Sequence, residues 1–532
     1  MNVNAKRDNS RIREIEIMDS TLRDGEQTNG VSFLPHEKLM IARMLLHDIN
    51  VDRIEVASAR VSEGEKDAVA RICRYAKTIG KLDSVEVLGF VDNNKSVDWI
   101  AECGGHVINL LAKGSYKHCT QQLKMSSEEH LAHIKQTIDY ALSKGFTVNL
   151  YLEDWSSGMR DSRDYLFMMM DELVKLPIKR FLLPDTLGIL NPLQCVEYMR
   201  QMVRRYPNSH FDFHAHNDYD LAVSNSLAAV LSGAKGLHVT VNGLGERCGN
   251  APLASVQVIL KDMFGAKTNI KEDRLNDISR LVEGYSGIAV APNTPVVGDN
   301  VFTQVAGVHA DGDNKDKLYC NDLVPERFGR HREYALGKNS GKANIIQNLN
   351  ELGLELTPEQ TKAVTKRITE LGDRKELVTQ DDLPYIVSDV LKHSTPEDKV
   401  KLVSYMVSTS YGLKPIASVK VEIEGKEYED RSSGDGQYDA FVKALRNIYK
   451  VKLGKTFPTL DNYQVTIPPG GRTDALVQTV ITWREGDRIW RTRGLDADQT
   501  EAAIKATLKM LNMYEADKSD EQPASPRNLD ME

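Results

Sequence analysis

The chain has 532 residues, 41% of them hydrophobic, and its 68 lysines and arginines against 76 aspartates and glutamates give a formal charge of −8. This acidic balance argues against a protein that binds nucleic acid or a membrane surface, because both partners need a clustered cationic face. We therefore expect small molecules as partners. The six cysteines are scattered and form no C-x-x-C pair, which predicts reduced thiols. The N-terminus is polar and the sequence has no long apolar run, so we expect a cytoplasmic protein.

Short β-rich runs recur through the first 240 residues, and each is followed by a longer segment of helical period. This alternation is typical of parallel βαβ units. Eight units predict an α/β fold, a (β/α)8 TIM barrel over residues 1–285, rather than an open doubly wound sheet. The predicted strands are Glu14–Met18, Arg53–Val56, Val85–Phe90, Val107–Leu111, Thr147–Leu152, Arg180–Leu183, Phe211–His214 and Leu237–Val241.

Beyond the barrel the pattern changes. Turn-forming residues at Ala291–Pro295 and a capping box at Thr357–Gln360 predict small helical linker subdomains over residues 286–398, with helices from Pro358 to about Gly372 and over Asp382–Lys392. We expect a charged, disordered tail over residues 515–532.

The segment 399–514 contains a weak internal duplication, in which strand-like runs lead to a turn and then a helix, twice over. This pattern predicts a C-terminal α+β domain. The expected elements are the strands Ser418–Glu424 and Lys426–Asp430 with the helix Gln437–Tyr449, and then the strands Gln464–Ile467, Ala475–Trp483 and Arg488–Arg493 with the helix Asp498–Leu511.

Polar residues follow several predicted strands, at the end of a barrel where active sites form. Asp24 follows the first strand, His214 ends the seventh, and His216 stands two residues further on. Residues i and i+2 of a strand point to the same side, so the two imidazoles can share one cation. With a carboxylate they suit a divalent metal, and Zn²⁺, Mn²⁺ and Mg²⁺ all remain open. The alternative is that both histidines are ordinary core or surface residues.

Two neighbouring features have alternatives of their own. Arg23, beside Asp24, provides a cation for a reaction that builds negative charge on a carbonyl oxygen, or else forms a structural ion pair. Gly243, Gly245 and Gly249 follow the eighth predicted strand and do not have the spacing of a dinucleotide-binding fingerprint. We expect close backbone packing there instead.

Three separate segments, in order, resemble the signatures of the DRE-TIM metallolyases. Within that group they are similar to the acetyl-CoA-dependent 2-oxoacid condensing enzymes, which are the isopropylmalate, citramalate and homocitrate synthases. The segments are Asp19–Gln27, His214–Asp218 and Asn242–Ala251. The resemblance continues through Ala306–Gly312, Leu336–Lys342, Gly434–Gly436 and Pro468–Ala475, so it covers nearly the whole chain.

The resemblance implies a set of roles. Asp24, His214, His216 and Asn250 would surround a divalent metal that chelates the 2-oxoacid, while Arg23 would stabilise the developing alkoxide. Thr186 would hold the substrate carboxylate. The residues that would handle water and the proton removed from acetyl-CoA, the co-substrate, are Glu153, His309 and Tyr319. A thioester methyl is a weak carbon acid, so its deprotonation needs a positioned base.

Four segments resemble long-form citramalate synthases: Val85–Asp92, Val107–Gly114, Asn149–Trp155 and Asn314–Asn321. By that resemblance Leu88, Leu111 and Tyr151 would form a pocket around the methyl of pyruvate, although these residues could also be ordinary barrel core. Such a small apolar wall prefers pyruvate over 2-oxoisovalerate. We therefore predict citramalate synthesis on the route to isoleucine, with 2-isopropylmalate synthesis on the route to leucine as the alternative.

The C-terminal domain resembles the regulatory and dimerisation domain of these synthases. The resemblance implies a homodimer that is inhibited when a branched-chain amino acid binds this domain. It also makes a lyase that cleaves a hydroxyacyl-CoA the weaker alternative. A scaffold or sensor with an inactive barrel is disfavoured by the intact set of Arg23, Asp24, His214 and His216.

Overall fold

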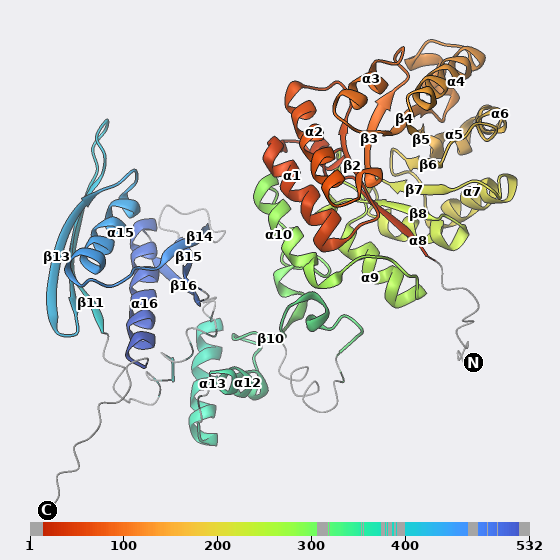
Figure 1. Ribbon diagram of the computed structural model, residues 1–532. Helices are drawn as coiled ribbons and strands as arrows, with labels where there is room; N and C mark the ends of the chain where they lie inside the picture. The colour runs from red at the N-terminus through yellow and green to blue at the C-terminus, as the bar shows by residue number, and fades with distance from the viewer. Residues whose placement is uncertain are drawn as a thin grey trace, which may run out of the picture. The chain divides into compact units, whose positions relative to one another are not determined.

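The structure is a computed structural model that describes residues 14–305, 318, 320–352, 354, 356–373, 378, 380, 383, 386–387, 390, 399–466, 477–486, 488–496 and 498–520. The chain forms two compact units. Unit 1 comprises Met1–Thr303 and Lys317–Glu333, and unit 2 comprises Gln304–Asp316 and Tyr334–Glu532 (Figure 1). Among the described residues, every helix is too short or too polar to cross a membrane.

Unit 1 contains a closed barrel of eight parallel strands, in which each strand pairs with the next and β8 pairs with β1. All eight predicted strands are present, with small shifts at their ends, so the predicted TIM barrel is confirmed. The strands are β1 (Glu16–Asp19), β2 (Arg53–Ser58), β3 (Val85–Phe90), β4 (Val107–Lys113), β5 (Thr147–Glu153), β6 (Arg180–Asp185), β7 (Phe211–Ala215) and β8 (Gly236–Val239).

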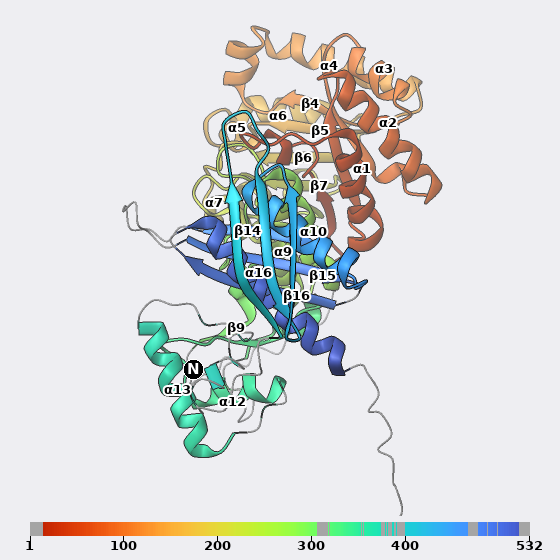
Figure 2. The ribbon, with the colours of Figure 1, turned by 90° about the vertical axis from the view of Figure 1, so that its left-hand side faces the viewer.

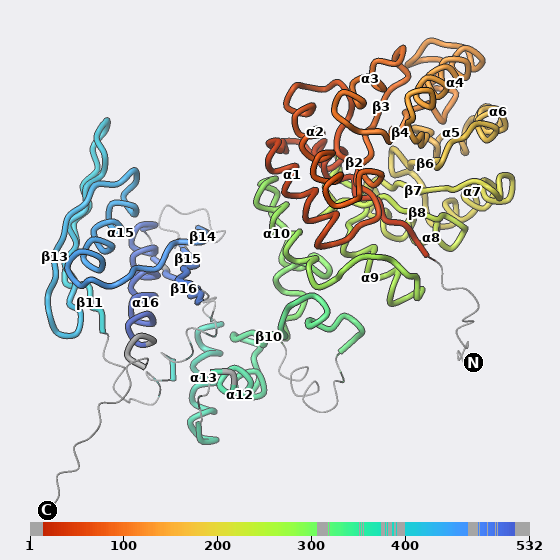
Figure 3. The backbone as a smooth tube through the Cα atoms, viewed as in Figure 1, coloured from red at the N-terminus to blue at the C-terminus, as the bar shows by residue number. Residues whose placement is uncertain are grey.

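Helices follow the strands around the outside of the barrel, as the tube in Figure 3 shows. Their apolar faces bury the strands, which explains why most strand residues are inaccessible to solvent. The helices of this layer are α1 (Pro35–Arg43), α2 (Glu63–Thr78), α3 (Lys95–Glu102), α4 (Ser127–Ser143), α5 (Trp155–Asp161), α6 (Arg163–Leu173), α7 (Pro192–Arg205), α8 (Ala222–Ser232), α9 (Leu253–Phe264) and α10 (Leu275–Ser286).

A buried ion-pair network occupies the N-terminal end of the barrel. Arg53, the first residue of β2, contacts three carboxylates: Glu16 at 3.2 Å, Glu86 at 3.2 Å and Asp212 at 2.5 Å. His238 Nε2 also lies 3.2 Å from Asp212 Oδ2. The network therefore has a protein cation at its centre.

After the barrel, short elements lead into two helices. β9 (Thr303–Gln304) and β10 (Glu333–Tyr334) form a two-stranded sheet, and α12 (Lys342–Glu351) and α13 (Pro358–Asp373) follow. The predicted capping box opens α13, since the Thr357 and Gln360 side chains each accept a hydrogen bond from the other residue's amide. Most of the helix predicted over Asp382–Lys392 lies outside the described residues.

The C-terminal part of unit 2 has the predicted duplication. Two three-stranded antiparallel sheets are each followed by a helix (Figure 2). The first copy is β11 (Val400–Ser408), β12 (Ile416–Ile423), β13 (Lys426–Ser433) and α15 (Gln437–Asn447). The second is β14 (Thr459–Thr466), β15 (Val477–Glu485), β16 (Arg488–Asp496) and α16 (Gln499–Asp520).

The largest differences from the prediction are one additional strand and two boundaries. The sequence did not predict β11, where a register irregularity between Leu402 and Ser404 interrupts the alternation of a strand. β14 begins at Thr459 rather than Gln464, and it has a similar irregularity between Leu460 and Asn462. The last helix ends at Asp520 instead of Leu511.

Candidate metal centre and substrate site

Three predicted metal ligands meet at the C-terminal end of the barrel. Asp24 lies on the loop after β1, His214 lies in β7, and His216 follows it by two residues. Asp24 Oδ2 is 3.0 Å from His214 Nε2 and 3.8 Å from His216 Nε2, and the two Nε2 atoms are 3.3 Å apart. Side chains separated by about 190 residues in sequence are thus close enough to bind one ion.

Asn250, the fourth predicted ligand, also belongs to this cluster. Its Nδ2 donates hydrogen bonds to Asp24 Oδ2 at 3.1 Å and to the Leu244 carbonyl at 3.1 Å. Its Oδ1 is buried without a hydrogen-bond partner, as are Nδ1 of His214 and Nδ1 of His216. Buried polar atoms are rarely left unpaired, so this oxygen is available as a ligand.

The electrostatics also suit a divalent cation. Burial lowers the pKa of His214, and it lowers the pKa of His216 to about 4, so both imidazoles are neutral at physiological pH. Although burial alone would raise the pKa of Asp24, the nearby Arg23 charge and the hydrogen bond with His214 hold it well below its usual value. Neutral imidazoles beside an ionised carboxylate form a mixed nitrogen and oxygen ligand set, and these residues fit a divalent metal.

The backbone around the cluster is closely packed. The Ser20 carbonyl accepts hydrogen bonds from the amides of Arg23, Asp24 and Gly25, which fixes the turn that carries Asp24. A Cβ at Gly245 would lie 2.3 Å from Nδ2 of Asn250. The predicted close packing of the glycine-rich segment is therefore confirmed, and it makes room for a candidate ligand.

Arg23 is held over the site by a carboxylate that the sequence did not single out. Its Nε donates to Glu55 Oε2 at 2.6 Å, and its Nη2 donates to the Tyr151 hydroxyl at 3.3 Å. Glu55 is fully buried in β2 and also accepts hydrogen bonds from Ser20 and Asn109. A charged residue between the apolar Ile54 and Val56 was the available signal.

The three predicted pocket residues, Leu88, Leu111 and Tyr151, form one apolar cluster with Leu182, separate from the main barrel core. Tyr151 also packs edge-on against His214, with ring centroids 6.4 Å apart. The cluster thus adjoins both the guanidinium of Arg23 and the candidate metal ligands. Leu182, which is completely buried, was not predicted.

Glu153 ends β5 at the same end of the barrel, where its carboxylate forms an ion pair with Lys113. The Thr186 hydroxyl accepts a hydrogen bond from the Asp154 amide at 2.9 Å. The structure therefore brings Thr186 and the β5 terminus together. His309 and Tyr319 lie outside the described residues.

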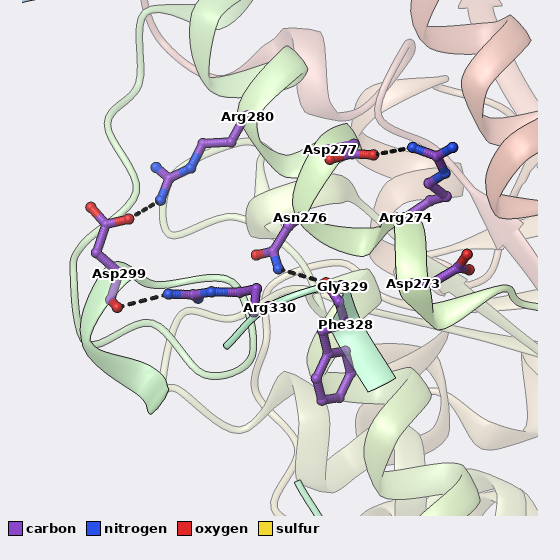
Figure 4. A pocket seen from close by; sticks show the side chains of 9 residues that line it. All are labelled: Asp273, Arg274, Asn276, Asp277, Arg280, Asp299, Phe328, Gly329 and Arg330. Atoms are coloured by element: carbon purple, nitrogen blue, oxygen red, sulfur yellow. Dashed lines mark hydrogen bonds and ion pairs between the residues drawn. The ribbon is translucent and has the colours of Figure 1, made fainter. Parts of the chain in front are cut away.

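A cavity of about 480 Å³ lies elsewhere in unit 1, beside α10 (Figure 4). Its charged groups largely satisfy one another: Arg274 pairs with Asp277 at 2.8 Å, Arg280 pairs with Asp299, and Arg330 donates to main-chain carbonyls. None of the predicted site residues that the structure describes lines this cavity, and it is distinct from the candidate metal centre.

Comparison with known families divides the chain into three consecutive matches. Residues 14–282 match the HMGL-like family, residues 296–376 match the homocitrate synthase post-HMGL domain-like family, and residues 377–515 match the LeuA allosteric (dimerisation) domain. The first match covers the barrel, and the last covers the duplicated C-terminal domain.

Full-length relatives carry two different names. A putative (R)-citramalate synthase of Methanopyrus kandleri is 36% identical over 95% of this chain and 97% of its own. An (R)-citramalate synthase of Methanocaldococcus jannaschii is 34% identical over 94% of this chain and 99% of its own. A 2-isopropylmalate synthase of the same organism is 36% identical over 94% of each chain.

Proposed function

We propose that this chain, which belongs to the family of acetyl-CoA-dependent citramalate and 2-isopropylmalate synthases, uses pyruvate as its 2-oxoacid. Members of the family condense acetyl-CoA with a 2-oxoacid. With pyruvate, water cleaves the thioester after carbon–carbon bond formation, and the products are (R)-citramalate and free CoA. Since relatives of both names have similar identities, the choice of pyruvate depends on the site.

The observation that carries this proposal is the apolar cluster of Leu88, Leu111, Tyr151 and Leu182. A 2-oxoacid held near Asp24 and Arg23 would direct its alkyl group toward this cluster, because the Tyr151 hydroxyl contacts Arg23. We infer that three leucines and an aromatic ring would accommodate a methyl group better than an isopropyl group. A small, rigid apolar pocket discriminates in this way.

Within this proposal, the chain's residues have separate tasks. Asp24, His214, His216 and Asn250 would hold a divalent cation, which when bound supplies a Lewis acid for the keto oxygen. Arg23 would donate a hydrogen bond to the oxygen that gains charge. Thr186 would bind the substrate carboxylate. Glu153, with His309 and Tyr319, would remove the methyl proton and orient the water.

The test is CoA release over a series of 2-oxoacids: pyruvate, 2-oxobutyrate and 2-oxoisovalerate. We expect the highest kcat/KM with pyruvate. Leu111→Ala should shift the ratio of kcat/KM toward the larger acids by about 10-fold or more, because one methylene in such a pocket is worth about 1–3 kcal/mol.

A matched control is Leu110→Ala. Leu110 belongs to the main barrel core rather than to the pocket cluster, so this substitution should lower stability without changing the ratio. If the parent enzyme prefers 2-oxoisovalerate and barely uses pyruvate, 2-isopropylmalate synthesis replaces this proposal.

We also propose that the chain acts as a homodimer and that isoleucine inhibits it by binding the C-terminal domain. The match to an allosteric dimerisation domain supports this proposal. So does the start of α15, where no side chain caps the helix and the backbone N–H groups can receive a carboxylate. At α16, by contrast, Asp498 already accepts hydrogen bonds from the Thr500 and Glu501 amides.

Two neighbouring glycines provide the test. A Cβ at Gly434 would lie 2.3 Å from the Ala440 nitrogen, whereas a Cβ at Gly436 would meet nothing within 4 Å. We expect Gly434→Ala to abolish inhibition by isoleucine in the CoA-release assay and Gly436→Ala to retain it, with basal turnover intact in both. Inhibition that survives Gly434→Ala would contradict this location.

A further inference from the structure

β4 and β5 present three paired residues to the barrel interior. Their register aligns Asn109 with Asn149, Leu111 with Tyr151, and Lys113 with Glu153. Since alternate residues of a strand share a face, these pairs form three successive layers. The amides of the first pair are hydrogen-bonded at 2.9 Å, the second pair belongs to the apolar cluster, and the third is an ion pair.

The third layer lies nearest the C-terminal mouth, one step beyond the apolar cluster. Lys113 is held there through its backbone, since its amide donates to His130 Nε2 at 3.1 Å and its carbonyl accepts from the Tyr165 hydroxyl at 2.9 Å. Gly114 then packs so closely on β5 that a Cβ would lie 2.6 Å from the Leu152 carbonyl. The backbone from which the Lys113 side chain extends is therefore fixed, and its ammonium reaches the Glu153 carboxylate from there.

Lys38 is also a buried lysine, and its contacts differ from those of Lys113. Lys38 is surrounded by the carboxylates of Glu26 and Glu65 and by two main-chain carbonyls. Within the described part of the chain, the Lys113 ammonium contacts a single group, the Glu153 carboxylate. Burial of an ammonium costs several kcal/mol unless its hydrogen bonds are satisfied, so Lys113 is a poor choice for stability alone.

We propose that Lys113 is a positioning residue that holds the Glu153 carboxylate at the mouth of the apolar cluster. This inference rests on the proposed condensation, in which Glu153 acts on the acetyl methyl or the attacking water. A flexible glutamate samples several rotamers, and the ion pair restricts it to the one that faces the substrate. Lys113 would thus act on the reaction through Glu153 rather than by touching the substrate.

The expected effect of Lys113→Met is a fall in kcat of about 100-fold, because a displacement of about 1 Å at a reacting group has that consequence. KM for both substrates should change little, since no binding contact is removed. Lys135→Met is the matched control, because Lys135 forms a partly exposed ion pair with Glu172 on the outer helices. The control should leave kcat unchanged.

A double-mutant cycle with Glu153→Gln decides how Lys113 acts. If Lys113 acts through Glu153, Lys113→Met should have almost no further effect on kcat in the Glu153→Gln background. Additive losses would overturn the proposal, because they would mean that Lys113 contacts substrate by itself. A loss confined to KM would overturn it for the same reason.

Rescue separates positioning from simple stabilisation. Lys113→Cys treated with 2-bromoethylamine regains an ammonium at nearly the same reach and should recover much of kcat, whereas iodoacetamide should recover none. The parent enzyme receives both treatments, because Cys248 is exposed. Equal inactivity after both treatments, with an unchanged melting temperature, would overturn the proposal.

All assays use whichever 2-oxoacid gives the highest CoA release in the parent enzyme. A parent that prefers 2-oxoisovalerate would overturn the proposed substrate, yet the cycle would still report on Lys113. The two failures are therefore distinguishable.

Discussion

The two ends of the barrel both bury charged groups, but they do so in different ways. At the N-terminal end, Arg53 supplies a cation between Glu16, Glu86 and Asp212. At the C-terminal end, the ligand atoms of Asp24, His214 and His216 face one another, and both imidazoles are neutral. In the first cluster the arginine lies among the carboxylates. In the second, within the described part of the chain, Arg23 contacts Asp24 from one side at 3.5 Å and no protein cation lies among the three ligand atoms.

This difference separates a structural cluster from a functional one. Buried carboxylates that surround an arginine satisfy each other and stabilise the fold once formed. Buried acceptors that converge without a protein cation between them cost stability, and such arrangements occur where a ligand binds. The comparison agrees with the general behaviour of TIM barrels, in which the C-terminal end carries catalysis and the N-terminal end carries stability.

The largest expected effect is on kcat, and it comes from a substitution in the candidate metal centre. Asp24→Asn should lower kcat by about 10⁴-fold, because the metal ligand and the charge beside Arg23 are both lost. The measurements are CoA release and metal content by mass spectrometry. Bound metal should fall below one equivalent. The melting temperature should change little, because the substitution also removes the cost of burying the Asp24 charge.

Chelation is the companion experiment. Treatment of the parent enzyme with EDTA should abolish turnover reversibly, and adding back Zn²⁺, Mn²⁺ or Mg²⁺ in turn would identify the ion. Full activity in a metal-free preparation would contradict the functional interpretation of the C-terminal end.

Much of this site followed from the sequence because its parts are local. His214 ends one strand-like run, Asp24 and His216 lie in the segments that follow such runs, and strand ends in a parallel barrel converge. Leu111 and Tyr151, in contrast, were predicted from the resemblance to citramalate synthases, and the structure shows them as neighbours in the register of β4 and β5. Spacing within a strand was enough only for His214 and His216, which share one side of their strand.

Glu55, Leu182 and Lys113 were harder to predict, because their roles depend on contacts between strands. Glu55 accepts a hydrogen bond from Arg23, 32 residues away, and Leu182 joins the apolar cluster only because β6 lies beside β5. Likewise, β11 was missed because a local irregularity interrupts its alternation. Register and bulges are tertiary properties that single-strand patterns do not contain.

A smaller effect, on the free energy of unfolding, is expected from a substitution at the N-terminal end of the barrel. Arg53→Met should destabilise the fold by about 3 kcal/mol, because Glu86 and Asp212 are left as buried carboxylates without their cation. Denaturant unfolding measures this loss. The kcat of the folded variant should stay near that of the parent, in contrast to Asp24→Asn.

The free energy of unfolding should also depend on pH in opposite directions in the parent and in Arg53→Met. In the parent, burial opposes ionisation of Asp212, but Arg53 outweighs it and holds the pKa well below its usual value. The ionised carboxylate thus contributes stability above the unfolded pKa of about 4, and this contribution is lost as the pH falls further. In the Arg53→Met variant, burial should raise the pKa of Asp212 in the folded state above its unfolded value. The free energy of unfolding should therefore decrease as the pH rises from 5 to 8. Adding Asp212→Asn to Arg53→Met should restore part of the stability at pH 8. If the stability of Arg53→Met alone instead rises with pH, as it does in the parent, Arg53 does not organise this end of the barrel.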